Sequence, residues 1–204
     1  MNMEINPSEY KILIVEDNDS LREMLVNIFK SLYTVITAVN GKEGLEKTCS
    51  EMPHIVISDI IMPEMSGTEL CLAIKQNFDT CHIPVVLLTA KTTIEHNLEG
   101  LKMGADDYIA KPFNINILLS RCNNLVNNRI MLQEKFSKQP QINTLILTNN
   151  ILDKKFMDKV TEIIENEIDN VNFSVDQLVA QMGIARTKLF TKLKAITGQT
   201  PSDL

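Results

Sequence analysis

Short, continuous apolar runs alternate with longer amphipathic stretches between residue 11 and about residue 127. The runs lie at 11–15, 35–37, 55–57, 85–88 and 108–110. Between the first two runs, Leu21, Leu25 and Ile28 show the three-and-four spacing of one buried helix face. Strands that are apolar throughout and separated by helices are typical of a parallel sheet that is covered on both faces.

The pattern changes after Asn127, which predicts a second domain. Residues 131–152 mix polar residues with Pro140 and a short apolar patch, and the helix before them continues into this segment. From Lys154 onward only helical periodicity remains. We therefore expect an α/β domain with a flavodoxin-like, doubly wound, five-stranded parallel sheet, then a linker and a small all-α domain. Their expected ranges are 10–130, 131–152 and 153–204.

The composition narrows the class of protein. No apolar run approaches the roughly 18 residues that a membrane span needs, and the N-terminus lacks a signal-peptide core. The net charge of −6 does not fit a chain that coats nucleic acid. The four cysteines form no CxxC pair and the three histidines show no ligand spacing, so any metal chemistry must come from carboxylates. We expect a cytoplasmic location and reduced thiols.

Side chains suited to phosphate chemistry follow the predicted strands at the point where each strand ends. Glu16 and Asp17 follow the first run, and Asp59 follows the third. Thr89 and Lys111 follow the fourth and fifth runs. Because a doubly wound sheet gathers its chemistry at the carboxyl ends of its strands, we expect these side chains to share one shallow pocket. The alternative, that the acids only cap the following helices, accounts for single positions but not for the whole set.

Three carboxylates in one pocket predict a cation and a nucleophile. They repel one another unless a cation joins them, and hard oxygen ligands with open positions suit Mg²⁺. A phosphoryl group attacked by Asp59 needs its developing charge neutralised, which Mg²⁺ and Lys111 can do from two sides. Thr89 offers a hydroxyl donor to a phosphoryl oxygen. The product is an acyl phosphate, which is a covalent mark on Asp59.

Four segments carry these residues in order: 12–18 (ILIVEDN), 58–67 (SDIIMPEMSG), 88–90 (LTA) and 104–113 (GADDYIAKPF). Together they resemble the receiver domain of response regulators in two-component signalling. The resemblance implies that Asp59 accepts a phosphoryl group from the phosphohistidine of a sensor histidine kinase. It also implies Mg²⁺ held by Asp17, Asp59 and the backbone carbonyl of Ile61, with Glu16 acting through water. Such a domain catalyses only its own phosphorylation and dephosphorylation, so we do not expect an enzyme.

The resemblance further implies how the site is regulated. Thr89 and Tyr108 match the pair that relays phosphorylation, in which the aromatic ring turns inward behind the hydroxyl. The peptide bond before Pro112 is expected to be cis, which X–Pro bonds tolerate. Ile61 and Lys91 should flank the phosphoryl group, and an apolar Ile61 should hinder the attacking water and lengthen the life of the phosphate.

Asp107 and Arg121 predict a contact between two copies of the chain. They lie where receiver domains often form a twofold dimer through the fourth helix, the fifth strand and the fifth helix. We expect a homodimer with an Asp107–Arg121 pair across its axis, although exposed ion pairs contribute little energy.

Residues 174–197 predict a helix, a turn and a second helix. Ser174 and Gln177 have the spacing of a capping box, and Gly183 allows a left-handed turn. From Gly183 onward four basic residues stand against one acidic residue, a net of +3. The second helix therefore concentrates the positive charge that contact with DNA phosphates requires, although a solvated helix face is the alternative.

The segments 173–183 (FSVDQLVAQMG), 186–198 (RTKLFTKLKAITG) and 200–202 (TPS) resemble the first helix-turn-helix of AraC-family transcription regulators. The resemblance implies two sets of DNA contacts: Thr187, Phe190 and Thr191 with the major groove, and Arg186, Lys188 and Lys192 with phosphates. Ala185 stands where a Ser usually caps the recognition helix, and Thr191 stands where an Arg is common. Both departures predict weaker DNA contact.

The AraC family joins two helix-turn-helix units by a long helix, and this chain stops at Leu204, where that helix would begin. We expect a shortened chain or one that has lost the second unit. A receiver domain followed by an AraC-type module resembles the cytoplasmic end of a membrane-anchored hybrid sensor, whose kinase lies on the same polypeptide.

The predicted function is a two-component response regulator in which phosphorylation of Asp59 controls transcription through a DNA-binding output. One alternative is a phosphorelay or protein-interaction module whose helical tail does not touch DNA. Another is a phosphohydrolase of the haloacid-dehalogenase type. Those enzymes carry a second Asp two residues after the nucleophile, where this chain has Ile61.

Overall fold

The structure is a computed structural model that describes residues 10–90, 104–138 and 150–202. The polypeptide divides into two compact units, Met1–Asn127 and Asn128–Leu204. Lys91, which the sequence places beside the phosphoryl group, lies outside the described residues, as does the middle of the predicted linker. In the part of the chain that the structure describes, no helix has the length and apolarity needed to cross a membrane.

The first unit is built on a five-stranded parallel sheet in the order β2-β1-β3-β4-β5. The strands are β1 (Lys11–Val15), β2 (Thr34–Ala38), β3 (Ile55–Asp59), β4 (Val85–Thr89) and β5 (Asp107–Ala110). The three central strands, β1, β3 and β4, are almost wholly buried, which is why their sequences are continuous apolar runs. The predicted doubly wound, flavodoxin-like fold is confirmed.

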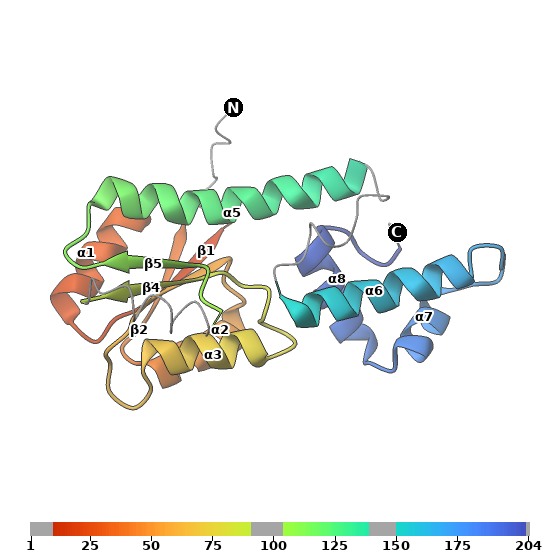
Figure 1. The fold of residues 1–204 in the computed structure, drawn as a ribbon, viewed down its shortest axis with the longest axis horizontal. Helices are drawn as coiled ribbons and strands as arrows, with labels where there is room; N and C mark the ends of the chain where they lie inside the picture. Colours follow the sequence, from red (N-terminus) through yellow and green to blue (C-terminus); the bar gives the residue numbers. More distant parts are fainter. Residues whose placement is uncertain (1–9, 91–103, 139–149, 203–204) are drawn as a thin grey trace. The chain divides into compact units, whose positions relative to one another are not determined.

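Helices cover both faces of this sheet, and Figure 1 shows α5 and α3 on opposite sides of it. The described helices of this unit are α1 (Asp19–Phe29), α2 (Gly41–Glu51), α3 (Gly67–Gln76) and the first part of α5 (Ile115–Lys138). The side chains of Asn18 and Asn40 cap α1 and α2, and Ser66 forms a capping box with Glu69 at α3. These caps start the helices directly after the strands.

The order of the strands determines where the site can form. The direction of winding reverses between β1 and β3, and their carboxyl ends carry Glu16, Asp17 and Asp59. Gly67 lets α3 begin close to the end of β3, because a Cβ at this position would lie 1.9 Å from the backbone oxygen of Asp59. The Gly67 amide donates to the Ile60 carbonyl at 2.9 Å, which closes the loop that follows Asp59.

The second unit is helical and contains α6 (Ile151–Asn166), α7 (Val175–Met182) and α8 (Arg186–Thr197) besides the end of α5. The capping box of Ser174 and Gln177 is present, and Gly183 takes the left-handed conformation with φ of 70°. Ala185 precedes α8 without a side-chain cap. Thus α7 and α8 are joined by the short turn that the sequence predicts.

Lys192 departs from its expected place. Its side chain is 1% exposed, and its Nζ lies 2.5 Å from Oδ1 of Asp153, which is 5% exposed and belongs to α6. Lys192 follows Leu189 by three positions and precedes Ile196 by four, so helix geometry puts it on the buried face of α8. The expectation that Lys192 contacts DNA phosphates is therefore corrected, because this ammonium faces α6.

Breaking this buried ion pair from one side should destabilise the second unit. Asp153→Ala leaves the Lys192 ammonium uncompensated in the interior, and such losses cost about 3–5 kcal/mol. Replacing both partners, Asp153→Leu with Lys192→Met, should be much milder because no buried charge is left unpaired.

The check is thermal unfolding of the whole chain followed by circular dichroism. Lys188→Ala on the exposed side of α8 is the matched control and should change stability by no more than about 0.5 kcal/mol. Equal stability of Asp153→Ala and Lys188→Ala would show that the pair does not hold α6 to α8.

Candidate functional site

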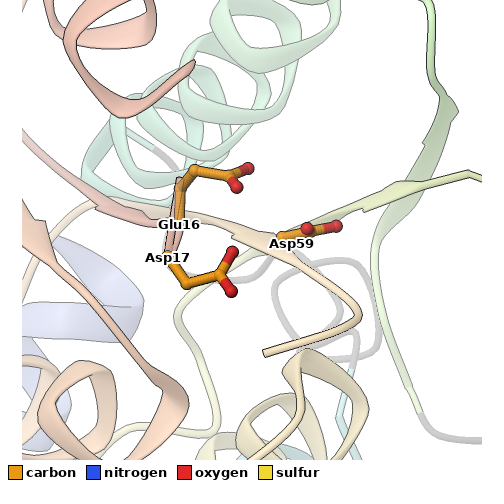
Figure 2. A group of neighbouring side chains, drawn as sticks. All are labelled: Glu16, Asp17 and Asp59. Atoms are coloured by element: carbon orange, nitrogen blue, oxygen red, sulfur yellow. The ribbon is translucent and has the colours of Figure 1, made fainter. Parts of the chain in front are cut away.

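Three carboxylates converge beyond the ends of β1 and β3. One ligand atom from each of Glu16, Asp17 and Asp59 lies within 4.8 Å of the other two. Figure 2 shows the three side chains side by side, two from the loop after β1 and one from the end of β3. Glu16 is buried, Asp59 is half-buried and Asp17 is exposed, so the cluster opens to solvent on the side of Asp17.

Lys111 supplies the positive charge of the cluster. Its Nζ lies 3.0 Å from Oδ2 of Asp59 and 3.0 Å from Oε2 of Glu16. The residue directly follows β5, and its backbone amide donates to the carbonyl of Thr89 at the end of β4. The Lys111–Pro112 peptide bond is cis, as predicted.

Asp59 is held by contacts at both of its carboxylate oxygens. Oδ1 accepts a hydrogen bond of 2.8 Å from the amide of Ile60, while Oδ2 faces Lys111. Ile61, the next residue of the loop, is 68% exposed. The metal-binding carbonyl and the flanking role that the sequence assigns to Ile61 stay predictions.

Burial makes the carboxyl group of Glu16 a weaker acid than that of an ordinary glutamate, because its pKa is raised. Desolvation raises the pKa of Glu16, and the hydrogen bond and charge of Lys111 act in the opposite direction. The amide of Asn18 also donates to Oε1 at 3.3 Å. A second cation near this carboxylate would further favour its ionised form.

Thr89 and Tyr108 lie on the neighbouring strands β4 and β5. Thr89 ends β4 and is 7% exposed. Tyr108 of β5 pairs with Leu87 of β4, and its ring packs against the core between the sheet and α3. Its hydroxyl is buried without a hydrogen-bond partner among the described residues, and this burial raises the pKa of Tyr108. The ring therefore occupies the inward position.

Asp107 and Arg121 form an ion pair within one chain, because Nη1 of Arg121 lies 2.7 Å from Oδ1 of Asp107. The sequence predicts this pair across a dimer axis. In the single chain each of these side chains already has the other as its partner. A pair across a dimer axis would therefore have to replace this ion pair within the chain by one between the two copies.

Arg22 is a residue that the sequence did not indicate. Its Nη1 donates to the backbone carbonyl of Glu16 at 2.7 Å, and its Nη2 forms an ion pair with Asp19. The spacing of Asp19 and Arg22, three positions apart on a helix, is the signal that could have drawn attention to it.

The residues assigned to DNA contact lie on α8 of the second unit. Arg186, Thr187, Lys188 and Thr191 are exposed. Arg186 forms an ion pair with Asp176 of α7, and its guanidinium carbon lies 5.2 Å from the centre of the half-buried Phe190 ring.

Comparison with known proteins agrees with this geometry. The chain is 42% identical over 192 residues to the histidine kinase P4 of Formosa agariphila, which covers 94% of this chain and 14% of that protein. It is 38% identical over 145 residues to the response regulator ArlR of Staphylococcus saprophyticus, which covers 71% of this chain and 60% of that protein. The chain thus spans less than two thirds of the length of either relative.

A solved structure shows the same fold. The receiver domain of a signal transduction histidine kinase from Syntrophus aciditrophicus superposes with a TM-score of 0.55 at 36% sequence identity, covering 58% of this chain and 90% of that one. Residues 12–123 match the family model of the response regulator receiver domain. With its sheet, its acidic cluster and these matches, the chain belongs to the family of response regulator receiver domains.

Proposed function

We propose that Asp59 accepts a phosphoryl group from the phosphohistidine of a sensor histidine kinase, with the help of Mg²⁺. The observation that supports this proposal most strongly is the convergence of three carboxylates within 4.8 Å beside the Lys111 ammonium. The similarity to a histidine kinase over 94% of the chain favours a kinase on the same native polypeptide as the partner.

The chemistry of the donor set fits Mg²⁺. Carboxylate oxygens are hard ligands, and the exposed side of the cluster at Asp17 leaves room for water and phosphate. Asp17, Asp59 and the carbonyl of Ile61 would hold the ion, and Glu16 would act through water. When bound, Mg²⁺ neutralises negative charge on the transferring phosphoryl group.

Several residues of the chain have separate roles in the proposed transfer of the phosphoryl group. An oxygen of Asp59 attacks phosphorus, the bond between phosphorus and the imidazole nitrogen breaks, and the imidazole of the kinase takes a proton. Lys111 is 3.0 Å from Oδ2 of Asp59, within reach of a phosphoryl oxygen attached there. The hydroxyl of Thr89 donates to another phosphoryl oxygen. The exposed apolar side chain of Ile61 keeps the attacking water away and prolongs the phosphorylated state.

Tyr108 suits a relay because the inward position of its ring has both a favourable and an unfavourable contribution to its free energy. The inward ring gains apolar contacts, but its hydroxyl is buried without a partner among the described residues, and such a group costs roughly 1–3 kcal/mol. A movement of Thr89 toward a phosphate changes the space behind it. Coupling of about 1–3 kcal/mol is enough to shift such a two-state element.

The output of the relay is DNA binding by the second unit, controlled by phosphorylation of Asp59. The exposed residues of α8, including Arg186 and Lys188, support this part of the proposal together with the resemblance to AraC-type modules. A homodimer through the face that includes Asp107 and Arg121 would bring two such units together. We place this activity in the cytoplasm, where DNA and the kinase that we propose as the partner are accessible.

A second candidate function is a phosphorelay or protein-interaction module without DNA contact. Two observations favour it: Lys192 is buried against Asp153, and Arg186 is paired with Asp176. Both remove positive charge from the set that the sequence assigns to DNA.

Replacing the nucleophile should abolish phosphorylation. Asp59→Asn removes the attacking carboxylate, so incubation with Mg²⁺ and a small phosphoryl donor should add no phosphoryl group, as measured by intact-protein mass spectrometry. Asp169→Asn, an exposed aspartate of the second unit, is the control and should label like the unaltered chain. Labelling of Asp59→Asn at the normal rate would refute the assignment.

Mg²⁺ should stabilise the first unit against heat, and EDTA should reverse the effect. At a concentration of 100 times Kd the gain is about 2.7 kcal/mol. Asp17→Asn should lose most of it. Because burial raises the pKa of Glu16, acidification protonates this carboxyl before an ordinary glutamate, so the Mg²⁺-dependent gain should shrink as the pH falls through that raised pKa. A pH-independent gain, or one retained by Asp17→Asn, would contradict the assigned ligands.

DNA binding separates the two candidate outputs. The leading proposal predicts salt-dependent binding of duplex DNA with Kd in the nonspecific range of about 10⁻⁴–10⁻⁶ M, measured by fluorescence anisotropy. Lys188→Gln should lower the salt slope by about one unit, whereas Lys155→Gln on an exposed position of α6 should not. Absence of salt-dependent binding by the phosphorylated chain favours the interaction module.

A further inference from the structure

Arg22 lies on the first turns of α1, directly after the loop that carries two of the three clustered carboxylates. Its Nη1 is 2.7 Å from the backbone oxygen of Glu16 and 3.5 Å from that of Asp17. Its Nη2 pairs with the carboxylate of Asp19, and the Arg22 side chain is only 16% exposed. One guanidinium thus joins two backbone carbonyls of the β1–α1 loop to the first residue of α1.

The contacts of Arg22 are directed at the backbone of the loop. The clustered carboxylates take their positive charge from Lys111, which touches Asp59 and Glu16. Arg22 instead donates a hydrogen bond to the backbone carbonyl of Glu16, in the loop that carries the side chains of Glu16 and Asp17. A role in orientation therefore fits its geometry better than a role in neutralising the cluster.

Hydrogen bonds around Arg22 tie the same loop onto α1. The side chain of Asn18 accepts from the amide of Leu21 at 2.9 Å, and the carbonyl of Asn18 accepts from the amide of Arg22 at 2.9 Å. The amide of Asn18 also donates to Oε1 of Glu16. The backbone between Glu16 and Asp19 is consequently held at both ends, with the guanidinium bridging the two.

An arginine is chemically suited to this bridge. Its guanidinium is a rigid planar fork with five donors, so it can bind a carbonyl and a carboxylate in fixed directions at the same time. A lysine has a single nitrogen on a flexible stem and cannot reproduce that geometry.

We propose that Arg22 is a positioning residue for the Mg²⁺ site, which by holding the backbone of Glu16 and Asp17 aims their carboxylates at Asp59. This inference rests on the proposed function, since it concerns the same metal site. It assigns Arg22 no contact with the ion or the phosphoryl group.

Simple electrostatics and positioning predict opposite results for Arg22→Gln. Removing a positive charge near a cation site lowers repulsion, so electrostatics alone would make Mg²⁺ bind more tightly. Loss of an outer partner that orients metal ligands typically weakens metal affinity by about 10–100-fold. The sign of the change in Kd therefore distinguishes the two roles.

The experiment is isothermal titration of the full chain with Mg²⁺, without a phosphoryl donor. Arg22→Gln should raise the Kd by about tenfold or more. Lys30→Gln is the matched control, because it removes the same charge from an exposed position just beyond the other end of α1 and should leave the Kd unchanged. Arg22→Lys, which keeps the charge but not the fork, should give an intermediate Kd.

Two further readouts separate positioning from a general loss of structure. Thermal unfolding in EDTA should show that Arg22→Gln and Lys30→Gln are both fully folded at the temperature of the titration. Amide ¹⁵N relaxation of the metal-free chain should show increased motion at Glu16 and Asp17 in Arg22→Gln. If Arg22→Gln proves too unstable to titrate, Arg22→Lys carries the same test: weaker binding supports the proposal and unchanged binding overturns it.

Two outcomes of the titration separate the role of Arg22 from the existence of the metal site. If the unaltered chain binds Mg²⁺ and Arg22→Gln binds it equally well or more tightly, the positioning role is overturned and the phosphorylation site stands. If the unaltered chain binds no Mg²⁺, the proposed metal site itself is wrong, and the role of Arg22 is overturned with it.

Discussion

Mutual repulsion of three carboxylates is the constraint around which the first unit is organised. Glu16, Asp17 and Asp59 place ligand atoms within 4.8 Å of one another, which is unfavourable unless positive charge is present. Lys111 supplies that charge from a strand end two places away in the sheet from β3. Its ammonium reaches Asp59 because β3, β4 and β5 are held in parallel register. A site that is electrostatically costly in isolation is therefore tied to the order of the whole sheet.

Lys111 also connects the acidic cluster to β4 and β5, the two strands that carry the proposed relay residues Thr89 and Tyr108. Lys111 hydrogen-bonds the end of β4 through its backbone amide, and Thr89 and Tyr108 lie on the two strands that this contact joins. In the proposed relay, a change of charge at Asp59 would reach the edge of the sheet through β4 and β5. The hydroxyl of Tyr108 at that edge is buried without a hydrogen-bond partner among the described residues, which disfavours the inward position of the ring by the cost of an unsatisfied polar group.

Several features of the site could be predicted because they depend on local pattern. The ends of the strands follow from the apolar runs, so the sequence predicts Glu16, Asp17, Asp59, Thr89 and Lys111 at one edge of the sheet. Contacts that depend on the direction of a side chain were missed. Lys192 looked like a surface cation, although its spacing from Leu189 and Ile196 already put it on the apolar face. The buried carboxylate of Asp153, thirty-nine positions earlier in the chain, compensates the Lys192 charge there.

The sequence by itself determined the fold class, the edge of the sheet that carries the clustered carboxylates and the capping box of Ser174 and Gln177, because these follow from periodicity and from short-range hydrogen bonds. The tertiary structure alone decided which charges meet: Arg22 with the carbonyl of Glu16, Arg121 with Asp107 of the same chain, and Lys192 with Asp153. Charged side chains are long and have many rotamers, so their partners are selected by packing and desolvation across elements that the linear sequence does not bring together.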